Sequence, residues 1–355
     1  MLDSAIAENL RTERTIPVNT PPGFNPPFPA YTARFPKNAK ELVMAVIGAQ
    51  YKSKDQDDGQ AIKKVSSYTT SVSVPEDCRP GFQELAASTD RRGFHNVAVL
   101  SYWSSKAAYD KWTEASGFEK WWQGLTPEGQ SHGWFREVFF PTMDRFETVF
   151  SNNEVPEGAA HMREGISGAI QEHVYWGSMR DRMPLSQTDA LVGDKYATTS
   201  RSDATKKRVS VRGKKNLAVI RSGQDWSGTV PDERKLYLET MHPTLEKGMN
   251  FLRDSGDEVG CYDCRFMGIV DPVTGEIGKD RTFGLAYFDD LKSLERWSRE
   301  HPTHMAIFGG FLKYAKTLDN NVTLRLFHEV LVLTPEQQLF EYIGCHEASG
   351  MLSAV

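Results

Sequence analysis

Two distant stretches of the chain show the same order of apolar and polar positions. Residues 97–103 form an apolar, strand-like run that leads into a helical pattern containing Trp112, and residues 282–288 lead in the same way into one containing Trp297. Tyr102 and Tyr287 are 185 residues apart (287 − 102), and so are the two tryptophans. A constant separation over two elements indicates a duplicated unit. The alternative is a chance resemblance between amphipathic segments.

Each copy is flanked by two further strand-like stretches, residues 45–47 and 135–138 in the first copy and residues 218–220 and 327–330 in the second. The resulting order, β-α-β-β-α-β, is that of a ferredoxin-like unit, in which helices cover one face of a single sheet. Two such sheets can bury their open faces against each other. The pattern therefore predicts an α+β fold of duplicated ferredoxin-like units, with a dimeric-α/β-barrel-type core and helices outside.

The same pattern divides the chain into five predicted segments. Residues 1–40 are expected to be an extended Pro-rich arm packed on the body, because proline removes backbone donors and excludes helix and central strand. The other four are a first ferredoxin-like half that serves as scaffold (41–155), a connecting segment that contributes Arg182 (156–212), a second ferredoxin-like half that carries the chemical site (213–335) and a C-terminal tail (336–355).

The two halves differ at positions that can do chemistry. Three polar residues of the second half have different counterparts in the first: His304 matches Glu119, His328 matches Arg136 and Ser222 matches Ala49. This difference predicts one site per chain, in the second half.

His304 falls in the first turn of a predicted helix. Pro302 suits the first helical position, where its missing N–H is not needed. The face that begins with His304 continues at helical spacing with Ile307, Phe308, Phe311 and Leu312. The positive end of the helix dipole disfavours imidazolium, so the ring stays neutral and can bind a metal. The alternative is a buried histidine that is hydrogen-bonded to the backbone.

His328 and Ser222 lie on the apolar faces of two predicted strands. His328 alternates in phase with Val330 and Val332, and an ionisable ring on such a face is costly unless it has a partner or a function. Ser222 ends an apolar run and could donate to a ligand. The alternatives are a core histidine and an ordinary strand-end serine. No nucleophile elbow surrounds Ser222, so a hydrolase is not indicated.

Arg180 and Arg182 lie beside aromatic residues and before Pro184, which suggests either anion binding or ion pairing. Cys261 and Cys264 have the spacing of a metal or redox pair, but no second such pair exists in the chain. The alternation around these cysteines predicts a strand, which disfavours zinc or redox use.

Composition narrows the classes of partner. The chain has 355 residues and a net charge of −5, and its basic residues form no stripe, so nucleic acid and anionic membranes are poor candidates. No apolar run approaches the roughly 20 residues that span a bilayer. The first residues lack a basic-then-apolar signal. We therefore expect a soluble, cytoplasmic protein.

Several sequence blocks together resemble the aldoxime dehydratases, which are haem enzymes. The most specific blocks are Tyr175-Trp176-Gly177-Ser178-Met179-Arg180, Ile220-Arg221-Ser222-Gly223-Gln224 and His301-Pro302-Thr303-His304. Ala30 and Tyr31 depart from the family pattern, in which Met and Trp follow the Pro-Pro-Phe-Pro block, and this departure affects the expected substrate size.

The resemblance implies a haem b enzyme that converts an aldoxime to a nitrile and water. By family pattern, His304 is the proximal iron ligand, and the distal catalytic residues are His328, Ser222, Arg182 and Glu147. The resemblance is compatible with a homodimer and with stimulation by FMN or another reductant.

The expected mechanism places the substrate nitrogen on ferrous haem, with Ser222 orienting the oxime hydroxyl and His328 acting as general acid and then base. Arg182 and Glu147 would set the position and the pKa of His328. The competing hypotheses are a haem peroxidase or chlorite-dismutase-like enzyme, a non-catalytic haem-binding protein and a haem-free structural barrel.

Overall fold

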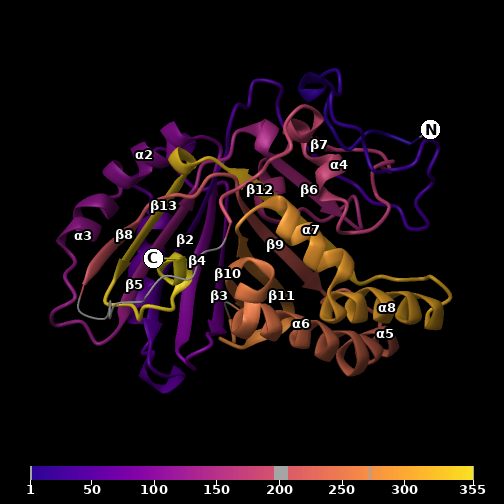
Figure 1. Ribbon diagram of the computed structural model, residues 1–355. Helices are drawn as coiled ribbons and strands as arrows, with labels where there is room; N and C mark the ends of the chain where they lie inside the picture. The colour runs from indigo at the N-terminus through magenta and orange to yellow at the C-terminus, as the bar shows by residue number, and fades with distance from the viewer. Residues whose placement is uncertain (1, 196–206, 272, 355) are drawn as a thin grey trace.

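An eleven-stranded antiparallel sheet runs through the computed structural model, which describes residues 2–195, 207–271 and 273–354 (Figure 1). The strands follow one another in the order β6-β12-β9-β11-β10-β3-β4-β2-β5-β13-β8. A separate pair, β1 (Ala33–Arg34) and β7 (Gly165–Ile166), ties the N-terminal arm to the connecting segment.

The first half of the chain supplies the run β3-β4-β2-β5 of this sheet, the helices beside it, and β6 at the edge next to β12. Its elements are β2 (Val43–Tyr51), α1 (Gln60–Thr69), β3 (Phe82–Thr89), β4 (His95–Trp103), α2 (Lys106–Ala115), α3 (Phe118–Gly124), β5 (Gly133–Phe139) and β6 (Phe146–Phe150). Strand β2 is buried along its whole length, which explains why its sequence is a continuous apolar run instead of an alternating one.

The second half repeats this order after a short helix and strand. Its elements are α4 (Met179–Arg182), β8 (Arg208–Val211), β9 (Leu217–Asp225), α5 (Pro231–Leu236), α6 (His242–Ser255), β10 (Cys261–Val270), β11 (Ile277–Phe288), α7 (Leu291–Glu300), α8 (Pro302–Thr317), β12 (Arg325–Leu333) and β13 (Gln338–Ile343). Helices α5 and α6 are joined by a π-helical turn, Tyr237–Met241.

The strand order within the two halves is the same. The run β5-β2-β4-β3 and the run β12-β9-β11-β10 each place the first strand between the fourth and the third, and β3 pairs with β10 to join the two runs. The segment predicted as a tail contributes β13, which pairs with β5 and β8. The tail is therefore part of the sheet.

Apolar residues from both runs pack into one core. The largest buried cluster combines residues of β2, β4 and β5 with residues of β9, β11 and β12. The sheet must fold back on itself to bring these strands together, because neighbouring strands are only about 4.8 Å apart. The opposite faces pack separately, one on α1 to α3 and the other on α6 and α7, so these helices lie on the outside.

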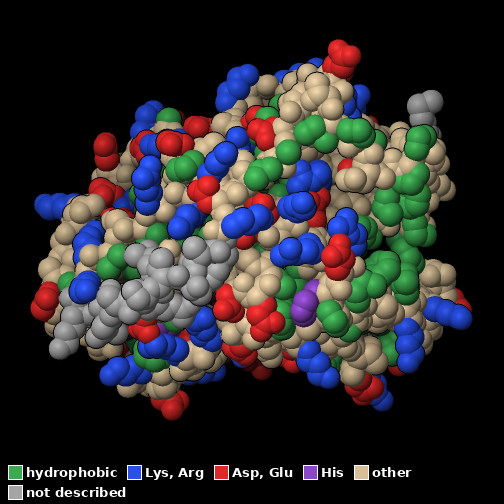
Figure 2. All heavy atoms as spheres, in the orientation of Figure 1, with side chains coloured by type: hydrophobic (Ala, Val, Ile, Leu, Met, Phe, Trp, Pro, Cys, Tyr) green, Lys and Arg blue, Asp and Glu red, His purple; other side chains and the backbone are tan. Residues whose placement is uncertain are grey.

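The surface shown in Figure 2 mixes Lys and Arg with Asp and Glu, and apolar side chains gather toward one edge of that view. Within the described part of the chain, no helix has the length and hydrophobicity needed to cross a bilayer.

Candidate functional site

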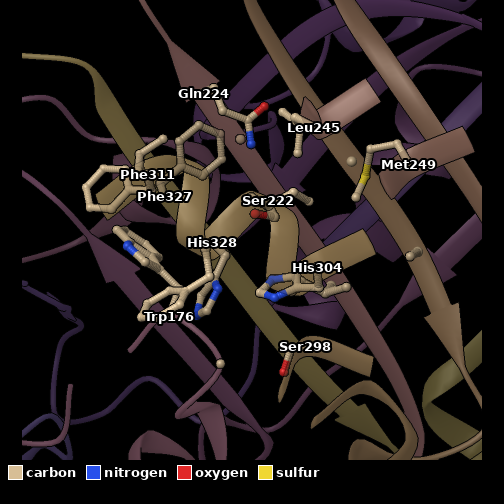
Figure 3. A pocket seen from close by; sticks show the side chains of 18 of the residues that line it. Trp176, Ser222, Gln224, Leu245, Met249, Ser298, His304, Phe311, Phe327 and His328 are labelled. Carbon is tan, nitrogen blue, oxygen red and sulfur yellow. The ribbon is translucent and has the colours of Figure 1, made fainter. Parts of the chain in front are cut away.

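An apolar cavity lies between the outer face of β9, β11 and β12 and the helices that cover it. Its volume is about 1120 Å³, including the opening to solvent. His304, Ser222 and His328 all line it, together with apolar and aromatic side chains from α6, α8 and the segment before α4. Figure 3 shows these three polar residues around the same space. The sequence therefore identified residues that the fold brings together.

His304 reaches the cavity from the first turn of α8, as predicted. Pro302 begins the helix, and the His301 ring caps it by accepting from the Thr303 N–H. Ile307, Phe308 and Phe311 line the same cavity, as their spacing predicted. The assignment of Leu312 to this face was wrong, because it is 45% exposed.

The His304 ring is held neutral and has one nitrogen without a partner. Burial lowers the pKa of His304 to about 4, and the Ser298 backbone only partly offsets this effect. Nδ1 is buried and forms no hydrogen bond within the described residues. The indole of Trp297 contacts the ring edge-on at 4.8 Å between centroids. A neutral imidazole in an apolar setting is the form that can bind a metal.

His328 and Ser222 face each other across neighbouring strands. Their Cα atoms are register partners in the β9–β12 ladder, so their side chains project from the same face of the sheet. The sequence had suggested that Ser222 ends its strand. In the structure, β9 continues to Asp225, so Ser222 lies inside the strand. Gly284 of β11 is the register partner of Ser222 on its other side, and the Met249 sulfur packs where a Cβ of residue 284 would lie.

Two charged side chains hold His328 by the same ring nitrogen. His328 Nε2 lies 2.9 Å from Glu147 Oε1 and 2.9 Å from Arg182 Nη2, and Arg182 Nε donates to Glu147 Oε2 at 3.0 Å. All three residues are buried. Glu147 comes from β6 and Arg182 from α4, so three separate segments meet at one imidazole. No hydrogen bond to His328 Nδ1 is found among the described residues.

The charges in this triad act in opposite directions on His328. Burial lowers the pKa of His328, Glu147 opposes that effect, and Arg182 adds to it, with a net lowering. Burial raises the pKa of Glu147, but Arg182 and His328 outweigh it, so the pKa of Glu147 lies below its ordinary value. The carboxylate therefore stays ionised, and the imidazolium form of His328 loses its proton more easily than that of a free histidine side chain.

The matching position of the first half holds an ion pair. Arg136 Nη1 and Glu119 Oε2, the counterparts of His328 and His304, form an ion pair at 2.9 Å. The rings of Tyr109, Phe118 and Trp122 surround the Arg136 guanidinium. An ion pair packed in aromatic rings thus occupies this position, which agrees with the prediction of a scaffold half.

One counterpart was assigned incorrectly from the sequence. In the ladders, Arg136 pairs with Ile47, whereas His328 pairs with Ser222. The neighbouring strands give the same result. Val99 of β4 pairs with Ile47, and Gly284 of β11, which is 185 residues after Val99, pairs with Ser222. The position equivalent to Ser222 is therefore Ile47 and not Ala49, a shift of two residues along the strand.

Sequence reasoning also missed several residues of the cavity wall. Trp176 contacts the His328 ring edge-on, with 5.6 Å between centroids, and its backbone carbonyl accepts from Arg182. Tyr237 and Met241 line the cavity from the π-helical turn. Such turns are often found at functional sites, but no sequence signal for one was used. Pro243, which cannot donate to the preceding turn, was the available signal.

The two cysteines of the predicted pair form no disulfide and lie buried in the sheet. Cys261 and Cys264 are free and buried on β10, and burial raises the pKa of both thiols. Within the described ranges, no group of three or more His, Cys, Asp or Glu side chains could hold a metal ion. A metal held by one histidine plus a non-protein ligand is compatible with that finding.

The cavity fits a haem by three features of the described residues. It is mostly apolar and large enough for a cofactor. It has a neutral histidine on the helix side, with a second histidine and a serine on the sheet side. Nδ1 of His304 is buried and has no hydrogen-bond partner among the described residues. An imidazole with an unpaired ring nitrogen is compatible with a ring that bound iron would hold in place.

Comparison with known proteins gives one consistent result. The family model described as haem-containing dehydratase matches residues 45–351. An aliphatic aldoxime dehydratase of Pseudomonas chlororaphis is 38% identical over 99% of this chain and 98% of its own, and a phenylacetaldoxime dehydratase of Bacillus sp. (strain OxB-1) is 32% identical over 94% of this chain and 93% of its own. The crystal structure of an aldoxime dehydratase in complex with butyraldoxime superposes with a TM-score of 0.91, at 37% identity, and covers 100% of this chain and 97% of that one.

Proposed function

The chain belongs to the haem-containing dehydratase family, and on this premise we propose that it dehydrates aldoximes, R–CH=N–OH, to nitriles and water, and that His304 would hold its haem b. The single observation that carries the proposal is the placement of His304 and His328 on opposite walls of one apolar cavity. When bound, ferrous haem supplies a coordination position for the oxime nitrogen and electron density that weakens the N–O bond.

The polar residues of the sheet side act on the oxime hydroxyl. Hydroxide is a poor leaving group, so the oxygen must gain a proton as the N–O bond breaks. Ser222 donates to or accepts from this hydroxyl and fixes its orientation next to His328, its register partner. His328 Nδ1, the ring nitrogen that faces neither Glu147 nor Arg182, donates the proton and water departs.

The same imidazole then removes the proton on carbon. Glu147 accepts from His328 Nε2–H, which leaves Nδ1 as the basic nitrogen once the first proton has gone. Arg182 neutralises Glu147 and limits the pKa of His328. Acid and base roles therefore alternate on one nitrogen, and the two buried charges keep the ring in place.

The lining of the cavity favours a neutral substrate over an anionic one. Among the described residues that line it, none is Lys, Arg, Asp or Glu. Arg182 is committed to Glu147 and to the backbone carbonyl of Trp176. A chlorite-dismutase-like enzyme would need a free distal cation for its oxyanion, so this competing function is not favoured.

We extend the proposal to the architecture. The matching strand orders support duplicated ferredoxin-like units forming a dimeric-α/β-barrel-type core, with segments at 1–40, 41–155, 156–212, 213–335 and 336–355. Residues 196–206 of the connecting segment lie outside the described residues. We also propose that the protein is a homodimer, that it is cytoplasmic, and that FMN or another reductant stimulates its activity.

The test is nitrile formation by the reduced protein without oxygen. We expect a Soret band in the purified protein, and we expect an aldoxime to be converted to its nitrile. His328→Asn should keep the Soret band and lower kcat by about 10²- to 10⁴-fold, the usual contribution of general acid–base catalysis. His242→Asn is a matched control, because this half-buried histidine of α6 does not line the cavity. Near wild-type turnover in His328→Asn would refute its assignment.

A further inference from the structure

Three consecutive residues of the short helix α4 reach three different parts of the molecule. Arg182 reaches His328 and Glu147 on the distal side of the cavity. Asp181 binds the N-terminal arm, accepting from the backbone N–H groups of Asn19 at 2.9 Å and Thr20 at 2.7 Å. Arg180 reaches the helix layer on the other side of the cavity. The mechanism described above gives this contact no role.

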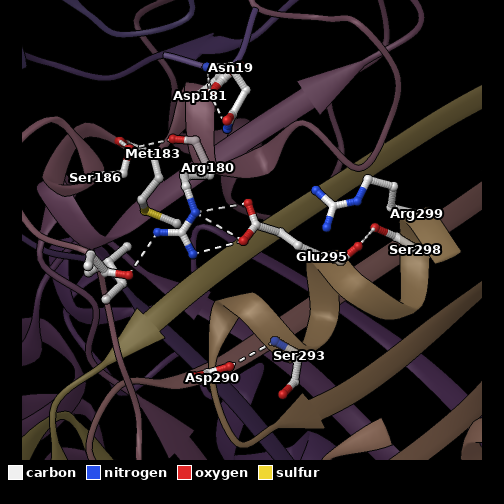
Figure 4. A network of polar contacts seen from close by, with 12 residues as sticks. Asn19, Arg180, Asp181, Met183, Ser186, Asp290, Ser293, Glu295, Ser298 and Arg299 are labelled. Carbon is white, nitrogen blue, oxygen red and sulfur yellow. Dashed lines mark hydrogen bonds and ion pairs between the residues drawn. The ribbon is translucent and has the colours of Figure 1, made fainter. Parts of the chain in front are cut away.

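The contact of Arg180 is a bidentate ion pair with Glu295 of α7 (Figure 4). Arg180 Nε and Nη2 lie 3.0 and 2.8 Å from Glu295 Oε2, and Nη1 donates to the Ala190 carbonyl at 2.8 Å. Both side chains are only 16% exposed. Planar fork geometry of this kind fixes direction as well as distance, which a lysine cannot do.

Glu295 is directly connected to the surroundings of His304. Its backbone carbonyl accepts from the hydroxyl of Ser298, one turn later, at 2.9 Å. The Ser298 backbone and the Trp297 ring are the immediate neighbours of the His304 imidazole. Helix α7 leads through His301 directly into α8. A displacement of Glu295 therefore displaces the wall against which His304 rests.

We infer that Arg180 and Glu295 are positioning residues, whose ion pair fixes the helix layer carrying His304 relative to α4, which carries Arg182 to His328. The inference rests on the proposed function, since it assigns the pair a role in setting the separation between the two sides of a bound haem. It explains why Arg180 and Arg182 are two residues apart on one short helix and pair with carboxylates on opposite sides of the cavity.

Vibrational spectra of the reduced haem protein test this coupling. The iron–histidine stretch reports the proximal side, and the C–O stretch of the carbon monoxide complex reports hydrogen bonding on the distal side. Arg180→Lys keeps the charge but loses the fork. We expect it to shift both bands and to lower kcat by about 10- to 100-fold, since a displacement of about 1 Å has that effect on catalysis.

Arg208→Lys, in β8, provides a matched control. Arg208 also pairs with a half-buried carboxylate, Glu341, and donates to two backbone carbonyls, but it is far from the cavity wall. It should move neither band. The double variant Arg180→Glu with Glu295→Arg restores the pair and should return both bands toward wild type. If Arg180→Lys does not fold, Glu295→Asp replaces it, because it shortens the acid by one methylene.

The outcomes separate the inference from the proposed function. Purified wild-type protein that binds no haem would overturn the proposed function. A haem protein in which Arg180→Lys shifts neither band, or only one, would overturn the inference and leave the proposed function intact. A shift of both bands in Arg208→Lys as well would also overturn it, because the effect would then be a general one.

Discussion

At the scale of single residues, the distinctive feature is that Glu147 and Arg182 share one nitrogen of His328. A carboxylate can only accept from Nε2–H, whereas a guanidinium can only donate to an unprotonated Nε2. The two neighbours therefore favour different proton arrangements of the same ring. The protonation state of His328 is set by the balance between them, and each can be removed separately.

Removing either neighbour should move the pH dependence of kcat/KM in opposite directions. Burial lowers the pKa of His328, Glu147 raises it and Arg182 lowers it. Activity that needs protonated His328 is lost as the pH rises through this pKa. Glu147→Gln should therefore shift the alkaline limb to lower pH, and Arg182→Met should shift it to higher pH. Shifts in the same direction would contradict this account of the triad.

His304 should be replaceable by free imidazole. His304→Gly removes the imidazole that reaches the cavity from the helix side, so the purified variant should show no Soret band. Added imidazole should restore the band, because the apolar lining of Ile307, Phe308 and Phe311 is unchanged. Absorption spectra with and without imidazole measure both effects, and wild-type protein with imidazole is the control. A Soret band in the variant before imidazole is added would mean that another group holds the haem.

These side chains were predictable because each is a polar group on an apolar face, where burial is costly unless the group has a partner or a function. His304 follows Pro302 at the start of a helix, and His328 alternates with valines along a strand. Trp176 could not be predicted in the same way, because an aromatic residue before a short helix has no periodicity that fixes its direction. Leu312 failed for the opposite reason: its spacing fits the face, but α8 projects past the sheet at that point and leaves it 45% exposed.

At the scale of elements, the close pairing of β9 with β12 sets the position of the distal residues. Gly223, next to Ser222, pairs with Phe327, next to His328. A Cβ atom placed on Gly223 would lie 2.0 Å from the Phe327 ring. The Phe327 ring therefore occupies the space that a side chain at Gly223 would fill.

Gly223→Ala should destabilise the protein and disturb the site. The Phe327 ring must move, and overpacking of this kind costs about 1–3 kcal/mol. Phe327 and its neighbour His328 both line the cavity, so kcat should fall as well. Urea unfolding and turnover measure the two effects. Gly165→Ala in β7 is the control, because a Cβ there meets nothing within 4 Å, and its stability should change by less than about 0.5 kcal/mol. Equal stability of Gly223→Ala and wild type would contradict the packing argument.

The elements that carry the repeat could be predicted, and those that join the halves could not. Residues 97–103 and 282–288 form β4 and β11, each followed by the expected helix. Strand β13 was missed because it pairs with β5 of the other half, just as β6 pairs with β12, and the local sequence pattern does not show such an exchange. The register of β2 was also misjudged by two residues, because β2 is buried along its whole length and its continuous apolar run does not mark the pairing position.

At the scale of the whole molecule, the halves exchange equivalent hydrogen bonds. Tyr102 of β4 donates to Glu329 of β12 at 2.6 Å, and Tyr287 of β11 donates to Glu137 of β5 at 2.6 Å. The tyrosines are 185 residues apart, and the glutamates are 192 apart (329 − 137). The sequence did not predict this crossing, because a hydrogen bond between the two halves leaves no mark in the local pattern of either half. Each half therefore supplies a hydrogen-bond donor to a buried carboxylate of the other half.

Because of this exchange, the two halves should unfold as one unit although only the second carries the cavity. Tyr102→Phe removes a partner of Glu329, and Tyr287→Phe removes a partner of Glu137; both carboxylates are fully buried. Each change should lower the free energy of unfolding by about 1–3 kcal/mol, the cost of a buried group that loses its hydrogen bond. Calorimetry should show a single transition in wild type and in both variants, at lower temperature in the variants. The largest core cluster contains residues of both halves, so neither can lose its inner face alone. Two resolved transitions, with Tyr102→Phe and Tyr287→Phe each lowering a different one, would mean that the halves are independently stable.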